Sequence, residues 1–173
     1  MDRELLVRAR AGDREAFEQI VLAKGEPLFR TALAIMGNEA DARDATQEAF
    51  ISAWKGLAFL KDLDRFDAWM GRILINSSRQ MLRSRRRVRE VPLEAGTDSP
   101  ALATDTPVAG GTTDFDAAFD RLNFDQRAML VLHHLHGYGV DEMAAWLGIP
   151  AGTVKWQLSR ARRALAAQLD EPA

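Results

Sequence analysis

The chain has 173 residues, of which 47% are hydrophobic, and this is enough for one compact domain or two small ones. No run of about 18 apolar residues is present, and the N-terminal segment is too charged for a secretion signal, so we expect a cytoplasmic protein without membrane insertion. Cysteine is absent, which excludes disulfides, thiolate zinc sites and cysteine nucleophiles.

The net charge of -2 conceals a very uneven distribution of charge along the chain. Seven arginines and no acid lie between Arg72 and Arg89, whereas seven acids and no Lys or Arg lie between Glu90 and Asp120. Local potential governs nucleic-acid binding, so the near-neutral total does not argue against a polyanionic partner.

Residues 2–36 are predicted to be helical, because apolar residues recur every three or four positions, and Asp13 is a suitable N-cap. We see only scaffold in this segment.

Residues 38–55 predict an amphipathic helix with two readable faces. A narrow apolar stripe of mostly small residues permits close packing, and it consists of Ala42, Ala45, Ala49, Ala53 and Trp54. The opposite stripe follows helical spacing and consists of Asp44, Gln47, Glu48, Ile51 and Lys55. That second stripe is either a solvated acidic face or a surface that docks on another protein.

After a loop over residues 57–64, Asp64 is predicted to cap a helix that starts near Arg65 and has Asp67 in its first turn. Its inward positions are Phe66, Trp69, Met70, Ile73 and Ser77. One outward stripe carries Arg72, Asn76, Arg79, Arg83 and Arg86. Such a stripe can contact successive phosphates and offer an amide to a base edge. The alternative is a solubilising surface, in which repulsion between like charges costs about a few tenths of a kcal/mol per pair.

Residues 91–113 are rich in Pro, Gly, Ser, Thr and acids and show no periodicity. They predict a flexible acidic linker, which divides the chain into domains at residues 1–90 and 114–173.

The C-terminal part predicts a helix-turn-helix. Val140, Met143, Ala144 and Leu147 follow helical spacing, residues 148–150 (Gly-Ile-Pro) break it, and Val154, Leu158, Ala161 and Leu165 resume it. The second helix is predicted to turn outward Lys155, Trp156, Ser159, Arg160, Arg162 and Arg163. This arrangement is typical of a helix that enters a DNA major groove, although a helical hairpin with a solvated charged face has the same pattern.

Three histidines, His133, His134 and His136, precede this motif. No Cys or carboxylate partner lies at ligand spacing, so we predict a helix C-terminus ended by Gly137 rather than a metal site.

Taken together, these motifs resemble an extracytoplasmic-function (ECF) sigma factor of bacterial RNA polymerase over residues 10–168. The resemblance rests on the order of DARDATQEAFISAW, FDAWMGRILINSSRQMLRSRRR, an acidic linker and LGIPAGTVKWQLSRARRAL. It implies an all-α fold of two small helical domains, sigma-2-like over 1–90 and sigma-4-like with the helix-turn-helix over 114–173, with the sigma-3 domain missing.

The resemblance also implies roles for the exposed faces. Asp44, Gln47 and Glu48, with Ile51 on the same stripe, fall where the family docks on the clamp helices of the polymerase large subunit. Arg72, Asn76, Arg79 and Arg83, with the preceding loop, fall where the family opens the −10 element and captures a flipped base. The −35 element would be read by Thr153, Lys155, Trp156, Ser159, Arg160, Arg162 and Arg163.

Where the family commonly has GTVKSR, this chain has GTVKWQ, so one hydroxyl and one arginine are missing. Trp156 is then available to contact a thymine methyl group or a sugar, or to pack on another protein.

The expected function is that of a transcription initiation factor that binds core RNA polymerase, recognises −35 and −10 elements and promotes melting. Expected partners are core polymerase, promoter DNA in duplex and single-stranded form, and an anti-sigma factor, with a monomer when free and no cofactor. The sequence offers no convincing nucleophile or metal-binding carboxylate cluster, so we expect no enzyme. The alternative is a dimeric helix-turn-helix repressor that works without core polymerase.

Overall fold

The computed structural model describes residues 1–90 and 113–170, with side chains omitted for 85–90. Within these ranges every regular element is a helix, which confirms the all-α prediction. No helix in the described ranges has the length and apolar character needed to span a bilayer. The predicted linker lies almost entirely outside the described residues.

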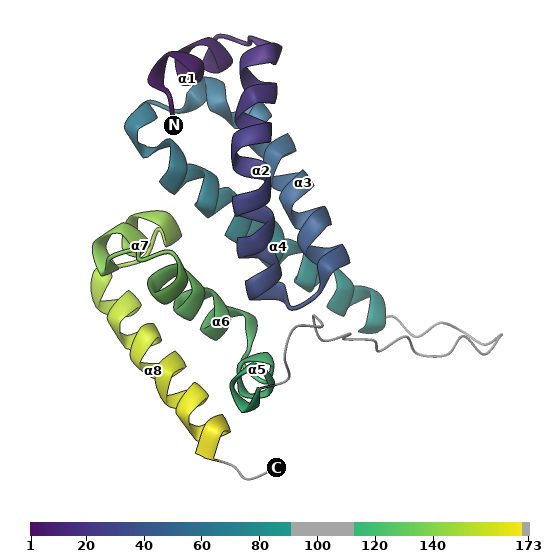
Figure 1. Cartoon of the computed structure of the whole chain (residues 1–173), viewed down its shortest axis with the longest axis vertical. Helices are drawn as coiled ribbons and strands as arrows, with labels where there is room; N and C mark the ends of the chain where they lie inside the picture. The colour runs from purple at the N-terminus through teal and green to yellow at the C-terminus, as the bar shows by residue number, and fades with distance from the viewer. Residues whose placement is uncertain (91–112, 171–173) are drawn as a thin grey trace, which may run out of the picture.

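Two groups of helices lie side by side (Figure 1). The first comprises α1 (Arg3–Arg10), α2 (Arg14–Met36), α3 (Glu39–Gly56), the 3-10 turns η1 (Leu57–Phe59) and η2 (Leu63–Arg65), and α4 (Phe66–Glu90). The second comprises α5 (Asp114–Asp120), α6 (Phe124–Leu130), the π turn η3 (Val131–Leu135), α7 (Val140–Leu147) and α8 (Ala151–Asp170).

The predicted helical segment at the N-terminus forms two helices, separated by a turn at Gly12, whose φ is 95°. Asp13 is confirmed as an N-cap, because its side chain accepts a hydrogen bond from the Ala16 amide at 3.1 Å. The second helix, α2, continues through Pro27 without a break.

Helix α3 packs between α2 and α4 through its small residues. The alanines predicted to form its apolar stripe, Ala42, Ala45, Ala49 and Ala53, are all completely buried. Trp54 differs from the prediction, since its side chain remains exposed. Its ring packs against the ring of Phe17 of α2.

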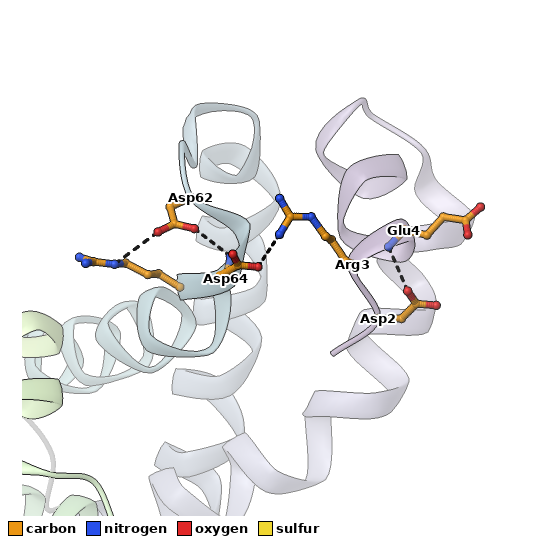
Figure 2. Close-up of polar contacts among 6 residues, drawn as sticks. Asp2, Arg3, Glu4, Asp62 and Asp64 are labelled. Carbon is orange, nitrogen blue, oxygen red and sulfur yellow. Dashed lines mark hydrogen bonds and ion pairs between the residues drawn. The ribbon is translucent and has the colours of Figure 1, made fainter.

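The start of α4 lies within one residue of the prediction, but the predicted cap, Asp64, was wrong. The capping residue is Asp62, which accepts a hydrogen bond from the Asp64 amide at 3.0 Å and starts η2, and α4 begins at Phe66. The Asp64 carboxylate instead accepts a hydrogen bond from Arg3 Nη1 at 2.6 Å and ties α1 to η2 (Figure 2). Both side chains are exposed, so this ion pair contributes at most about 1 kcal/mol.

The two helical groups share part of their core. Ile35 of α2 and Ile75 of α4 belong to the buried apolar cluster formed mainly by α6, α7 and α8. Trp146 of α7 is buried beside Gly71 of α4, where a Cβ atom would overlap the indole ring. Because α7 and α4 pack this closely, the helix-turn-helix lies against the arginine-bearing helix.

Candidate functional site

The outward face of α3 is free for a partner. All five residues of the predicted stripe are exposed, and they are Asp44, Gln47, Glu48, Ile51 and Lys55. Among the described residues, Asp44 and Glu48 have no ion-pair partner, whereas Arg43 and Glu39, which lie off the stripe, form an ion pair. The structure therefore brings carboxylates, an amide and one branched apolar side chain together on one accessible surface.

The residues of the arginine stripe of α4 differ in their exposure to solvent. Arg72, Asn76 and Arg83 are exposed as predicted, whereas Arg79 is half-buried and turned toward α6. The side chain of Arg86 lies outside the described residues.

Two contacts hold Arg79 against α6. Its Nη2 donates to Asp125 Oδ1 at 3.0 Å, and its guanidinium lies 5.8 Å from the centroid of the Phe124 ring. Asp125 and Phe124 therefore already contact Arg79, which is one of the four residues expected to bind the −10 element.

Beneath the stripe, the inward face of α4 follows the prediction. Phe66, Met70 and Ser77 are buried, and Trp69 and Ile73 pack on the same core from half-buried positions. Trp69 is therefore a packing residue rather than an exposed platform for a base. Phe59 of η1, in the loop before α4, is 82% exposed and is the accessible aromatic of that region.

The helix-turn-helix forms as predicted from α7 and α8. Gly148 ends α7 with a φ of 66°, and its amide donates to Ala144 O at 2.9 Å. Val154, Leu158 and Ala161 seat α8 on its partners. The pattern analysis missed Trp146, which lies outside the i, i+3, i+4, i+7 series of α7 and yet is buried.

The outward residues of α8 separate into two sets. Lys155, Trp156, Ser159, Arg160 and Arg163 are exposed, and Thr153 is half-buried near the start of the helix. Arg162 is exposed on the side that faces η3, where its Nε donates to His134 Nε2 at 3.3 Å. Burial, reinforced by the positive charges of His133 and Arg162, lowers the pKa of His134.

The histidines make separate contacts rather than a metal cluster. His133 Nδ1 lies 2.9 Å from Tyr138 O, and His136 Nε2 lies 2.9 Å from Thr31 Oγ1 of α2. Within the described ranges, no group of three His, Cys, Asp or Glu side chains is placed to hold a metal.

The sequence analysis did not find an apolar groove of about 930 Å³ between α2, α5, η3 and α8. Its lining includes Leu33, Phe119 and Leu165, together with Phe115, Leu135 and Leu169, which are exposed. Single apolar residues on separate short helices give no periodic signal, and only their assembly produces the groove.

Comparison with known families gives two matches on this chain. The profile described as "Sigma-70 region 2" matches residues 20–88, and the one described as "Sigma-70, region 4" matches residues 112–165.

Relatives of known type align along almost the full length. The ECF RNA polymerase sigma factor SigM of Mycobacterium tuberculosis is 34% identical over 165 residues, which cover 95% of this chain and 83% of SigM. The RNA polymerase sigma-E factor of Streptomyces antibioticus is 33% identical, with coverage of 92% and 87%.

Two solved structures are similar over most of the chain. The structure of CnrH in complex with the cytosolic domain of CnrY has a TM-score of 0.69 and 29% identity, with 99% of each chain covered. The sigma factor RpoE of Bartonella quintana, in complex with the anti-sigma factor NepR, has a TM-score of 0.67 and 27% identity, with 91% and 98% covered.

Proposed function

The chain belongs to the extracytoplasmic-function sigma factors of the sigma-70 family, and from that membership we propose that it is a transcription initiation factor. It binds core RNA polymerase, directs the enzyme to promoters that carry −35 and −10 elements, and promotes melting of the DNA. The observation that carries this proposal is the presence of both sigma regions on one chain, each with an exposed cationic helix face. A repressor would need a helix-turn-helix but has no use for region 2.

We assign one task to each exposed face. The α3 face of Asp44, Gln47, Glu48 and Ile51 docks on core polymerase. The α4 stripe of Arg72, Asn76, Arg79 and Arg83 binds the melted −10 strand. The α8 face reads the −35 duplex through Thr153, Lys155, Trp156, Ser159, Arg160, Arg162 and Arg163.

The physics of the two DNA tasks supports this division. Melting requires a surface that prefers the single strand, with cations for its backbone and a site that offsets a few kcal/mol of lost base stacking. Exposed Arg72 and Arg83, with Asn76 between them, supply charge and a hydrogen-bonding amide. Duplex recognition needs a rigid helix in a groove, and α8 is fixed by its buried side chains.

We propose residues 1–90 and 114–173 as two domains, joined by residues 91–113. A connected pair of DNA-binding units gains affinity because each raises the effective concentration of the other. We further propose a cytoplasmic, non-enzymatic protein without a cofactor, which is a monomer when free.

An anti-sigma factor is the other proposed partner. The RpoE relative is described in complex with the anti-sigma factor NepR, and CnrH with the cytosolic domain of CnrY. The apolar groove between α2, α5, η3 and α8 supports a protein partner, because it offers unpaired apolar surface for binding.

Binding to purified bacterial core polymerase tests the proposal. We expect the triple variant Asp44→Ala, Gln47→Ala, Glu48→Ala to bind about tenfold or more weakly than the wild type, a loss of about 1.4 kcal/mol.

The matched control is Glu15→Ala, Glu18→Ala, Gln19→Ala. It removes two carboxylates and one amide from exposed positions of α2, and we expect near wild-type binding. A wild-type chain that ignores core polymerase but binds duplex DNA as a dimer would refute the proposal and favour a repressor.

A further inference from the structure

Trp156 is an exposed indole on a helix whose packing is complete without it. Its side chain is 55% exposed, whereas the α8 residues that pack inward, Val154, Leu158 and Ala161, are buried. It lies in the second turn of α8, which begins at Ala151. An apolar ring at this position is therefore available to a ligand rather than needed by the core.

Arg160 holds the indole from one side. Its guanidinium carbon lies 5.4 Å from the centroid of the Trp156 ring, one helical turn further along α8. A cation over the ring face restricts the side chain and occupies only one of its two faces. The indole also borders a hollow beside α6, and more than half of its surface stays accessible.

The surroundings of Trp156 fit a polyanion. From Ala151 to Leu169, α8 contains no Asp or Glu, and Lys155, Ser159 and Arg163 are exposed on the same helix. A hollow of about 130 Å³ lies beside Trp156, and Asp125 is the one acid among the residues that line it. The carboxylate of Asp125 is already paired with Arg79.

The chemistry of the major groove narrows what such a ring contacts. The N-terminal part of a recognition helix reaches base edges, and the exposed apolar group on those edges is the 5-methyl group of thymine. Phosphates and sugars would be served by the neighbouring cations and the serine hydroxyl, and they carry no sequence information. A large apolar ring among cations is thus better suited to a methyl group than to the backbone.

We propose that Trp156 determines promoter specificity by packing its indole against the 5-methyl group of one thymine in the −35 duplex. This inference rests on the proposed function and adds the base feature that the α8 face selects. Trp156 would then make an apolar contact with a base, on a helix face that is otherwise cationic.

The test uses the holoenzyme of the full chain with core polymerase and removes single methyl groups from DNA. A duplex pool randomised over the −35 region first supplies the preferred sequence, and each thymine is then replaced by deoxyuridine. At one position the wild type is expected to lose about fourfold in affinity, the loss expected when one methyl group is no longer buried. The Trp156→Ala variant is expected to bind thymine and deoxyuridine equally at that position.

Two further variants separate specificity from general binding. Lys155→Ala is expected to weaken binding to the thymine duplex and to the deoxyuridine duplex alike. The fourfold ratio between these two affinities should remain, because a phosphate contact does not sense the methyl group. Trp156→Phe is expected to keep a reduced ratio, since it retains an apolar ring. Thermal unfolding monitored by circular dichroism establishes that each variant is folded.

The outcomes divide clearly. A holoenzyme with no methyl-sensitive position, or a Trp156→Ala variant that keeps the wild-type ratio, overturns this inference and leaves the proposed function intact. If Trp156→Ala lowers affinity for core polymerase while the ratio persists, Trp156 is a protein contact and the inference is wrong. A wild-type chain that does not bind core polymerase overturns the proposed function and this inference together.

Discussion

At the scale of single residues, His136 links the two helical groups through a polar contact made by a partly buried, titratable ring. Thr31 Oγ1 donates its proton to Pro27 O at 2.8 Å, so it accepts a hydrogen bond from His136 Nε2 at 2.9 Å. The imidazole also stacks on Tyr138. Burial lowers the pKa of His136 below its ordinary value of 6.5.

The direction of the pH dependence follows from that lowered pKa. The folded chain binds a proton on His136 less readily than the unfolded chain. Stability is therefore full above about pH 7.5, where neither state is protonated, and falls as the pH drops toward the folded pKa. We expect the wild-type chain to lose stability from about pH 7.5 to about pH 5.5, and His136→Gln to lose less over the same range.

Urea unfolding at several pH values measures this difference. Glutamine keeps a donor for Thr31 Oγ1 without a titrating ring. His134→Gln is a second test, because burial also lowers the pKa of His134, so this variant too is expected to lose less stability than the wild type over this range. Parallel pH curves for the wild type and His136→Gln would contradict the expectation.

At the scale of elements, the contact between α4 and α7 depends on the absence of one side chain. Gly71 is buried under the ring of Trp146, and a Cβ atom would overlap that ring. We expect Gly71→Ala to destabilise the protein, because overpacking costs typically about 1–3 kcal/mol and exceeds the gain of up to about 1 kcal/mol from replacing a helical glycine.

The control for this prediction is Gly25→Ala in α2. Gly25 is also helical, but a Cβ atom there meets nothing within 4 Å, so only the favourable helix effect of about 1 kcal/mol remains. Thermal unfolding should therefore shift in opposite directions for the two variants. Equal stabilisation of both would show that α7 is not packed on α4 in solution.

The sequence predicted those elements whose signals are local. The two faces of α3, apart from Trp54, and the buried positions Val154, Leu158 and Ala161 of α8 follow from apolar spacing alone, and they are confirmed. The cap before α4 was wrong because Asp62 and Asp64 are both suitable caps. Asp62 accepts the Asp64 amide, and the Asp64 carboxylate pairs instead with Arg3, 61 positions away along the chain. Trp146 was missed because its burial depends on α4 and not on the period of α7.

At the scale of the whole molecule, the described arrangement packs Arg79, which we propose as part of the −10 surface, against the second helical group. Arg79 contacts Asp125 and Phe124 of α6, which lie 46 and 45 positions further along the chain. The sequence predicted which residues share the α4 stripe but not this contact, because no local pattern encodes the packing of one group on the other.

A change at Asp125 should release Arg79. We expect Asp125→Asn to raise the affinity of the free chain for a randomised single-stranded DNA pool by about two- to fivefold, because a partly exposed ion pair is worth at most about 1 kcal/mol. Asp170→Asn removes the same charge from the end of α8 and serves as the control. Affinities are measured by titration at fixed salt. An equal gain in affinity for both variants would show that the loss of one negative charge, and not the release of Arg79, causes the effect.

The four buried alanines of α3 leave the other side of the same helix unconstrained by packing. The buried residues of α3 lie on one side, and the residues that we assign to polymerase docking lie on the other. Surface substitutions away from packed positions usually change stability by less than about 0.5 kcal/mol. Partner preference and fold are therefore separable on this helix, so its docking face is open to wholesale redesign, or to evolutionary drift, while the scaffold beneath it stays the same.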